Sequence, residues 1–364
     1  MDKLKVLIAD DTIVYRKILA EAVEGTGLGV VARSASNGAI ALEWLKQGGV
    51  DVVLLDVFMP EVDGIEALKV IKREYPDIVV IMISSGGSDN AAVTLEALKL
   101  GAMDFILKPS EASYDKNMDR IRNQLQVLFA QIKIKRFSAS PVQAYADSML
   151  QSSKDVKLHA ITSSPVKPII NKWAGADLVL VASSTGGPAA LETVFGAFPA
   201  SFKKPVLVVQ HMPPEFTRIL AETLDRKYQI KAVEGKNEDF VSNNQIIIAP
   251  GGFHMEVVSR GNEKVIALNS QPFVNGVRPA ADVLFTSVAK AYEGKNILAV
   301  ILTGMGNDGA QGVAELKRRC NCICLTQTEA SCVVYGMPRC VAEAGLSDEA
   351  VDLKDMGARI LQLV

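Results

Sequence analysis

Short apolar runs alternate with helical patterns twice along this chain, and this alternation restricts the possible folds more than any other feature. In the first half the runs lie at Val6–Ala9, Val52–Leu55, Ile78–Ile83 and Met103–Leu107. Runs that are apolar on both faces are typical of strands in a parallel sheet covered by helices. We therefore predict an α/β fold, a doubly wound parallel sheet built from five β/α units.

A second alternation begins at Asp177 and predicts a second α/β domain, Rossmann-like and mostly parallel. Its expected strands are Leu178–Ala182, Val206–Gln210, Ile246–Ala249, Ile297–Leu302 and Cys322–Leu325. Shorter alternating pieces at Met255–Val258 and Lys264–Leu268 predict a hairpin. Residues 135–172 are rich in serine and contain several prolines. We therefore predict a linker there, between a domain over 1–134 and a domain over 173–364.

The composition is that of an ordinary globular protein and argues against several other classes. The 364 residues suffice for two cores, and a net charge of −2 gives no reason to expect a nucleic acid as partner. No apolar run is long enough for a signal peptide or for membrane insertion. The five cysteines all lie between Cys320 and Cys340, which is not the spread of a disulfide framework. We therefore expect a cytoplasmic protein.

Charged residues stand at the ends of three predicted strands in the first domain. Asp10 and Asp11 follow the first strand, Asp56 follows a second, and Lys108 follows the last. The carboxyl ends of parallel strands meet at one edge of a sheet, so these groups should converge. Three carboxylates repel one another unless a cation such as Mg²⁺ lies among them, and a lysine can neutralise a phosphoryl group. With one aspartate as nucleophile, this domain is predicted to be a phosphorylation switch.

These positions also resemble a response-regulator receiver domain. The resemblance rests on Asp10-Asp11, DVFMPEVDG around Asp56, Ser84 after IMI, and GAMDFILKP. It implies the flavodoxin-like strand order 2-1-3-4-5, phosphorylation of Asp56 by a histidine kinase, and Mg²⁺ held by the three aspartates. The residues that it assigns to the switch itself are Ser84, Phe105 and Lys108.

In the second domain a serine, a histidine and an aspartate each follow a predicted strand. Ser184 lies in Ser-Ser-Thr-Gly-Gly-Pro, a turn into a helix whose backbone amides favour developing negative charge. His211 follows Val206–Gln210, and Asp308 lies in the loop after Ile297–Leu302. The three side chains would meet at one edge of the sheet, which suits a Ser-His-Asp triad in which the histidine activates the serine.

Two alternatives involve the same part of the chain. Gly304, Gly306 and Gly309 spell G-x-G-x-x-G after a predicted strand, and Glu329 lies 20 residues beyond the last glycine. This is the pattern of a dinucleotide-binding enzyme. Asp308 argues against it, because a carboxylate at the helix N-terminus would repel a pyrophosphate. The other alternative is a receiver-controlled binding protein without catalytic activity.

Six motifs of the second domain closely resemble the catalytic domain of chemotaxis protein-glutamate methylesterases. They are SSTGGP, QHMPPEFT, IAPGGFHMEV, RPAADVLFTSVAK, ILTGMGNDGA and EASCVVYGMP, in this order. The resemblance implies Ser184, His211 and Asp308 as catalytic residues, with Thr185 and Met305 lining the site. It further implies a carboxylic ester hydrolase that demethylates glutamates and deamidates glutamines on chemoreceptors, without a cofactor in this domain.

The resemblance also bears on the choice of nucleophile and on its control. Ala182-Ser183 stands where the family usually has Gly-Ala, so two adjacent serines are candidates, and the Ser-Thr-Gly-Gly order favours Ser184. The unphosphorylated receiver is expected to block the catalytic edge, and phosphorylation of Asp56 to relieve the block. The final residues, ILQLV, contain no receptor-docking motif that we recognise.

Overall fold

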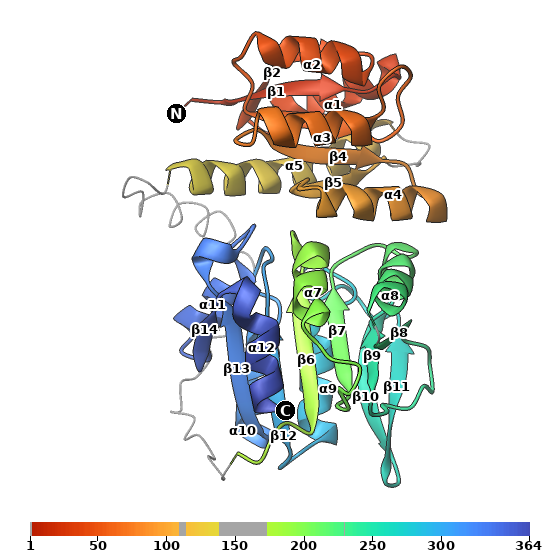
Figure 1. The fold of residues 1–364 in the computed structure, drawn as a ribbon, viewed down its shortest axis with the longest axis vertical. Helices are drawn as coiled ribbons and strands as arrows, with labels where there is room; N and C mark the ends of the chain where they lie inside the picture. Colours follow the sequence, from red (N-terminus) through yellow and green to blue (C-terminus); the bar gives the residue numbers. More distant parts are fainter. Residues whose placement is uncertain (1, 109–113, 138–172, 229) are drawn as a thin grey trace. The chain divides into compact units, whose positions relative to one another are not determined.

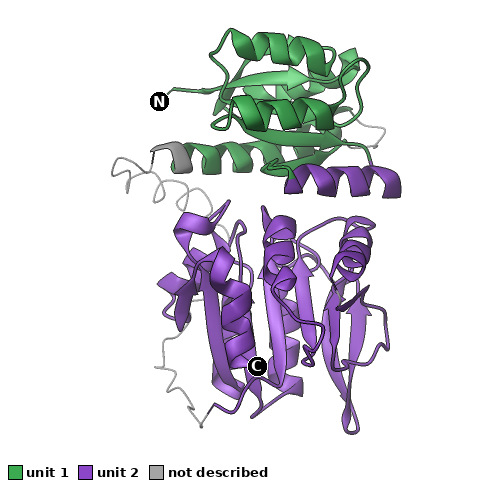
Figure 2. Cartoon of the chain, in the orientation of Figure 1, with its two compact units in different colours: residues 1–85, 100–166 green, residues 86–99, 167–364 purple. Residues whose placement is uncertain are grey.

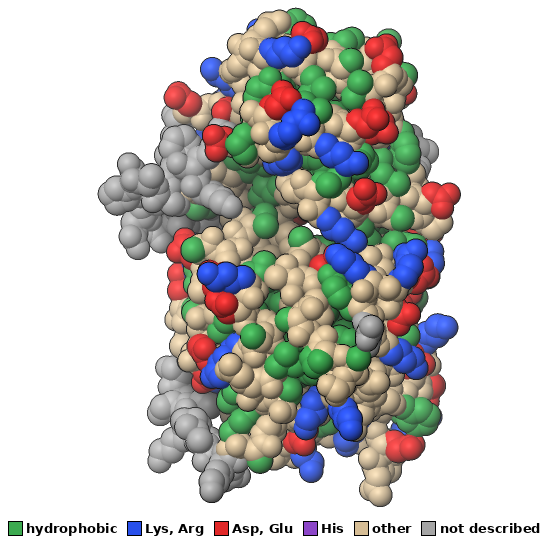
Figure 3. Space-filling model, in the orientation of Figure 1, with side chains coloured by type: hydrophobic (Ala, Val, Ile, Leu, Met, Phe, Trp, Pro, Cys, Tyr) green, Lys and Arg blue, Asp and Glu red, His purple; other side chains and the backbone are tan. Residues whose placement is uncertain are grey.

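The computed structural model describes residues 2–108, 114–137, 173–228 and 230–364. Most of the predicted linker, from residue 138 to residue 172, lies outside the described residues. The chain divides into two compact units (Figure 2), one of residues 1–85 and 100–166 and one of residues 86–99 and 167–364. Acidic and basic side chains are mixed over the visible surface (Figure 3), in keeping with the net charge of −2. No helix in the described ranges has the length and apolar character needed to cross a bilayer.

A five-stranded parallel sheet forms the centre of the first unit (Figure 1). Its strands are β1 (Leu4–Ala9), β2 (Gly29–Ala35), β3 (Val52–Asp56), β4 (Val79–Ser84) and β5 (Asp104–Leu107). Their order is β2-β1-β3-β4-β5, which confirms the predicted topology. The helices that follow them in the chain are α1 (Ile13–Gly25), α2 (Gly38–Lys46), α3 (Gly64–Glu74), α4 (Ser88–Lys99) and α5 (Tyr114–Phe137). Of these, α4 is counted with the second compact unit.

The core of this sheet follows the apolar runs of the sequence. Every residue of β3 is buried, and Val6 and Leu54 share a buried cluster with Leu19 of α1 and Phe129 of α5. The sequence pattern does not reveal β2, because this edge strand pairs only with β1 and is partly exposed along most of its length. An edge strand that faces solvent needs no continuous apolar run.

A seven-stranded parallel sheet forms the second unit, in the order β14-β13-β12-β6-β7-β9-β8. Its strands are β6 (Leu178–Ser183), β7 (Val206–Gln210), β8 (Lys231–Glu234), β9 (Gln245–Ile248), β12 (Asn296–Ile301), β13 (Asn321–Gln327) and β14 (Glu349–Val351). The predicted hairpin is confirmed as β10 (His254–Arg260) and β11 (Glu263–Asn269), which form a separate antiparallel sheet. The α/β class predicted for this half is therefore correct.

The direction of winding of the large sheet reverses between β6 and β12. From β6 the chain moves outward to β7 and then to the edge strand β8, and β9 fills the place between these two. The chain then returns to the other side of β6 with β12, β13 and β14. Open α/β sheets bind ligands at the carboxyl ends of the strands beside such a reversal. The loops after β6, β7 and β12 are therefore the place to look for a site.

Helices complete the second unit. In the second unit the helices are α7 (Gly187–Gly196), α8 (Phe216–Lys227), α9 (Ala281–Ala291), α10 (Ala310–Arg319), α11 (Met337–Glu343) and α12 (Leu353–Leu363), with a 3₁₀ turn η1 (Glu329–Ser331). Both edge strands of the large sheet, β8 and β14, were missed, as were α11 and α12. Helix α12 did carry a signal, since its buried residues Met356, Ile360 and Leu363 are spaced as one face of a helix.

Candidate active sites

The turn after β6 presents Ser184. Gly186 adopts the left-handed conformation, with φ of 76°, and Pro188 occupies the first turn of α7, so the chain turns sharply from strand to helix. The Ser184 amide donates to Thr303 O at 3.0 Å, and the Gly187 amide donates to Ser184 O at 2.7 Å. These bonds fix the backbone of Ser184, whose side chain lies at a half-buried position.

The neighbouring serine has a different environment. Ser183 is fully buried, and its hydroxyl donates to Gln210 Oε1 at 2.6 Å. The amide nitrogen of the same Gln210 side chain donates to Ser184 O at 3.0 Å and to His211 O at 3.3 Å. Ser183 is therefore part of a buried network that joins the ends of β6 and β7, and it is not accessible to a substrate.

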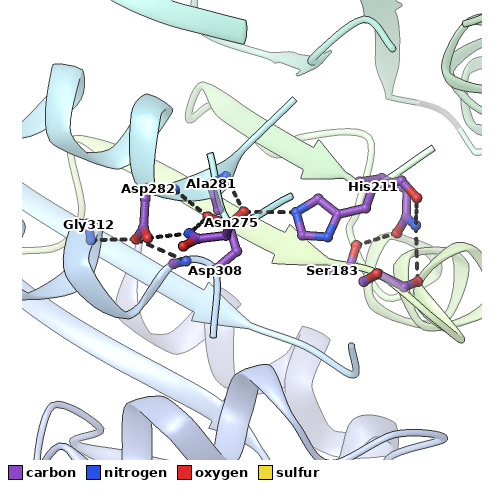
Figure 4. A network of polar contacts seen from close by, with 10 residues as sticks. Ser183, His211, Asn275, Ala281, Asp282, Asp308 and Gly312 are labelled. Carbon is purple, nitrogen blue, oxygen red and sulfur yellow. Dashed lines mark hydrogen bonds and ion pairs between the residues drawn. The ribbon is translucent and has the colours of Figure 1, made fainter. Parts of the chain in front are cut away.

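His211 and Asp308 form a close pair (Figure 4). His211 Nε2 lies 2.8 Å from Asp308 Oδ2, and the exposed fractions of the two side chains are 8% and 2%. The second ring nitrogen, Nδ1, is on the side of the ring that faces the end of β6, where Ser183 lies in Figure 4. Within the described ranges no hydrogen bond joins the Ser184 hydroxyl to this ring. Two members of the predicted triad, His211 and Asp308, are thus in direct contact, and Ser184 lies in the adjacent loop after β6.

Asp308 is held by four donors. Besides His211, it accepts hydrogen bonds from the Ala281 amide at 2.5 Å, the Asp282 amide at 3.1 Å and the Asn275 side-chain amide at 2.8 Å. Burial acts to raise the pKa of this carboxyl group, but the hydrogen bond from His211 and the other donors hold it below the usual value. Asp308 is therefore an ionised acceptor, which fixes the tautomer and orientation of the imidazole.

The first unit brings together the predicted switch residues. Lys108 Nζ lies 2.8 Å from Asp10 Oδ2 and 2.7 Å from Asp56 Oδ2. Asp10, Asp11 and Asp56 each offer an oxygen within 4.8 Å of the others, with Asp10 and Asp56 buried and Asp11 exposed. Burial is the main reason that the pKa of Asp56 is raised to about 6. This set of clustered carboxylate oxygens fits a hard divalent cation.

Ser84 and Phe105 lie on the two strands beside this cluster. Ser84 is fully buried at the end of β4, and its carbonyl accepts from the Lys108 amide at 2.7 Å. Phe105 is half-buried on β5, where it pairs with Met82. Ser84 therefore adjoins Lys108 at the carboxyl edge of the sheet. Phe105 lies on β5, the edge strand that leads to Lys108.

Comparison with known proteins identifies both halves. A family model described as CheB methylesterase matches residues 179–360, and one described as response regulator receiver domain matches residues 6–118. The chain belongs to the CheB methylesterase family. Relatives named protein-glutamate methylesterase/protein-glutamine glutaminase include one from Pyrococcus abyssi, 37% identical over 100% of this chain and 94% of its own length. Another, from Symbiobacterium thermophilum, is 39% identical over 99% of this chain and 97% of its own length.

A solved structure supports the architecture of the second unit. The Thermotoga maritima CheB methylesterase catalytic domain is 35% identical, with a TM-score of 0.50, and the match covers 52% of this chain and 99% of that one. The two predicted resemblances, to a receiver and to a chemotaxis methylesterase, are therefore confirmed. The protein is a CheB-family hydrolase with a receiver domain in front of its catalytic domain.

In this CheB-family chain the glycine motif after β12 does not serve a dinucleotide. The amides of Gly309 and Gly312, at the start of α10, both donate to the carboxylate of Asp282, at 3.0 and 2.7 Å. A pyrophosphate bound at this helix N-terminus would need those amides and would meet Asp308 as well. The geometry therefore supports the hydrolase and not the dinucleotide alternative.

Thr185 and Met305 lie in the two loops that flank the pair. Thr185 is buried, and its carbonyl accepts from the Thr303 hydroxyl at 3.0 Å. Met305 is half-buried in the loop after β12. Both positions are compatible with the predicted lining role.

Three side chains of the network were not predicted from the sequence. Asn275 donates to both Asp308 and Asp282, as Figure 4 shows, and Gln210 donates to the carbonyls of Ser184 and His211. Burial, and then the charge of Asp308, raise the pKa of Asp282 to about 6. Two signals in the sequence could have indicated such residues: the aspartate inside the motif RPAADVLF and the glutamine directly before His211. A polar side chain in an apolar helix start or an apolar strand needs a buried partner.

Proposed function

We propose that Ser184, His211 and Asp308 are the catalytic residues with which this CheB-family hydrolase removes methyl groups from glutamate esters of chemoreceptors and deamidates receptor glutamines. The observation that supports this most is the 2.8 Å contact of His211 Nε2 with the buried carboxylate of Asp308, beside the turn that carries Ser184. Hydrolysis of glutamate methyl esters and glutamine amides is the activity for which the matched relatives are named.

The proposed reaction uses the free nitrogen of His211. Because Asp308 accepts from Nε2, Nδ1 is the nitrogen that can take the proton of the Ser184 hydroxyl. The serine oxygen then bonds to the carbonyl carbon of the γ-ester, the bond from that carbon to the methoxy oxygen breaks, and methanol leaves with the proton from His211. Water hydrolyses the acyl-serine by the same proton transfers, which regenerates Ser184 and the glutamate. A glutamine substrate would release ammonia in place of methanol.

The oxyanion would be stabilised by backbone amides of the glycine turn. Two amides in that turn are already engaged, because Ser184 donates to Thr303 O and Gly187 donates to Ser184 O. Donors for a developing negative charge therefore belong to the remaining amides at the start of α7 and in the loop that carries Met305.

The first unit is proposed to control this hydrolase by phosphorylation of Asp56. Asp10, Asp11 and Asp56 would hold Mg²⁺, which would neutralise charge on the incoming phosphoryl group. Lys108 would remain paired with the phosphorylated side chain, and Ser84 and Phe105 would respond to it. The phosphodonor is proposed to be a chemotaxis histidine kinase, and the setting the cytoplasm. The proposed division is a receiver over 1–134, a linker over 135–172 and a catalytic domain over 173–364.

The direct test is methanol release from methylated receptor by the purified full-length protein. We expect Asp308→Asn to lower turnover by about 10³-fold or more, because the imidazole would lose the acceptor that fixes its tautomer. The same protein should still bind receptor. Binding without methanol release by the wild-type protein would instead favour the non-enzymatic alternative.

A further inference from the structure

Two aspartates at the active site cap each other's helices. Asp308, which precedes α10, caps the start of α9, and Asp282, which lies in the first turn of α9, caps the start of α10. Asp308 lies just before α10 and accepts from the first amides of α9, those of Ala281 and Asp282. Asp282 lies in the first turn of α9 and accepts, through Oδ1, from the amides of Gly309 and Gly312 at the start of α10. Each carboxylate is thus stabilised by the N-terminal amides of the opposite helix.

Asn275 joins the two carboxylates. Its side-chain nitrogen donates to Asp282 Oδ2 and to Asp308 Oδ1, at 2.8 Å in both cases. A side-chain amide has two N–H groups, so one can serve each acid. The backbone of Asn275 is in the left-handed region, with φ of 53°, where asparagine is one of the few residues tolerated. The amide therefore stands between two acids that would otherwise face each other.

The loop that carries Asn275 is itself anchored on both sides. Arg278 Nη1 donates to Ser270 O and to Gln271 O, at 2.8 Å each. The ring of His254, which is buried, lies with Nε2 at 3.0 Å from Pro272 O. A loop fixed in this way can hold the Asn275 amide in one place, which a bridge between two carboxylates requires.

We propose that Asn275 and Asp282 are positioning residues of the active site, which hold the Asp308 carboxylate in the orientation that accepts from His211. Asp308 Oδ2 is the oxygen that contacts His211 and the Ala281 amide, whereas Oδ1 accepts from Asn275 and Asp282. Both donors on Oδ1 thus come from the segment that ends in the first turn of α9. These two hydrogen bonds restrict rotation of the Asp308 carboxylate about its Cβ–Cγ bond.

Loss of the bridge should therefore act on the imidazole. Without the amide, Asp282 Oδ2 and Asp308 Oδ1 would lose the N–H groups that lie between them, and the two carboxylates would repel each other across the gap. The raised pKa of Asp282, caused by burial and by Asp308, is consistent with two acids held this close. His211 would keep its acceptor but lose its fixed direction toward the end of β6.

The inference rests on the proposed function, and the experiment uses the full-length protein with methylated receptor. Asn275→Gly removes the amide and leaves the backbone unstrained, because glycine adopts the left-handed region freely. We expect kcat to fall about tenfold, the factor that corresponds to the loss of one hydrogen bond to a charged group, with KM unchanged. Asn275→Asp keeps the size and the backbone preference but places a third acid against two, and it should be slower still.

A matched control is Asn244→Gly. Asn244 also has a left-handed backbone, with φ of 59°, but it is exposed in the loop before β9. It should keep wild-type kcat, so that any general effect of an added glycine on stability is measured separately. Asp282→Asn is the second test. The amide oxygen that it introduces can accept from Gly309 and Gly312, but its NH₂ group would then face the NH₂ group of Asn275, and two donors cannot bond to each other.

The second readout is the proton magnetic resonance signal of the His211 Nε2–H group. A hydrogen bond to an ionised carboxylate moves such a signal downfield, and we expect it to return upfield in Asn275→Gly but not in Asn244→Gly. Wild-type kcat in folded Asn275→Gly, or an unmoved signal, would overturn the inference while the triad stands. Full activity of Ser184→Ala and Asp308→Asn would overturn the proposed function itself.

Discussion

The two adjacent serines after β6 are distinguished by their surroundings. Ser183 is fully buried and donates to Gln210, whereas Ser184 is half-buried in the turn. We expect Ser184→Ala to lower methanol release by about 10³-fold or more, because no hydroxyl remains to attack. Ser183→Ala should keep most of the activity and lose roughly 1 kcal/mol of stability with its hydrogen bond. An inactive, folded Ser183→Ala protein would show that the nucleophile is the other serine.

Asp56 gives a pH-dependent prediction for metal binding. Burial raises its folded pKa from 3.8 to about 6, although Lys108 acts in the opposite direction. Between these values the folded state binds more protons than the unfolded state, so the stability contribution of Asp56 falls as pH rises from about 4 to 6. Above pH 6 the ionised group is available to a cation.

Calorimetric titration of Mg²⁺ into the full-length protein should therefore show weaker binding at pH 5 than at pH 7. Asp56→Asn should weaken binding at pH 7 and flatten the pH dependence, because the titrating carboxylate is gone. Equal affinity at the two pH values in the wild-type protein would count against a site that includes Asp56.

At the scale of elements, the start of α7 depends on a glycine. A Cβ atom at Gly187 would collide with Gln210 Oε1 and would lie 2.9 Å from Ser183 Cβ. Gly187→Ala should displace the Gln210 side chain, which holds the carbonyls of Ser184 and His211, and most activity should be lost. Gly196→Ala, at the other end of the same helix, adds a methyl group 3.1 Å from a carbon of Tyr228 and should keep kcat. Initial rates and melting temperatures of both variants decide this prediction.

The elements that the sequence predicted are those whose physical signal is local. Central strands such as β3 and β6 are buried throughout and appear as unbroken apolar runs. The missed strands β2, β8 and β14 are all sheet edges, where one side has no strand to pair with and the apolar run is short or interrupted.

The same reasoning explains which site residues the sequence predicted. Ser184, His211 and Asp308 follow three strands that neighbour one another in the sheet, so strand order alone brings their loops together. Asn275 follows no strand of that sheet and reaches the site through a loop after the hairpin, and Asp282 reaches it from the start of a helix. Positions of that kind depend on tertiary packing, which residue spacing does not encode.

At the scale of the whole molecule, each half of the described chain has a hydrophobic core cluster of its own. One is drawn from residues 4–132 and the other from residues 178–346. A chain that starts at residue 172 should therefore fold and carry the complete Ser184, His211 and Asp308 set. If the unphosphorylated receiver restrains the hydrolase, this shortened protein should release methanol faster than the unphosphorylated full-length protein.

The initial rates of the two proteins on methylated receptor test that restraint. Asp56→Asn in the full-length chain serves as control and should stay slow with phosphodonor present. A folded, shortened protein that is no faster than the whole would mean that the receiver activates by a direct contribution instead of by release from a block.

The exchange of carboxylates between α9 and α10 has a consequence for how this enzyme comes apart. The N-terminal amides of either helix lack their acceptor until segments 26 residues apart have packed together. Fraying of one helix start therefore also leaves the aspartate of the other helix without its donors. The amide protons of Ala281 and Gly312 should then exchange with deuterium at one shared, slow rate. The Asp308 carboxylate is thus positioned in the same cooperative step as the fold around it, and a molecule that has begun to open there should already have lost its hydrolase activity.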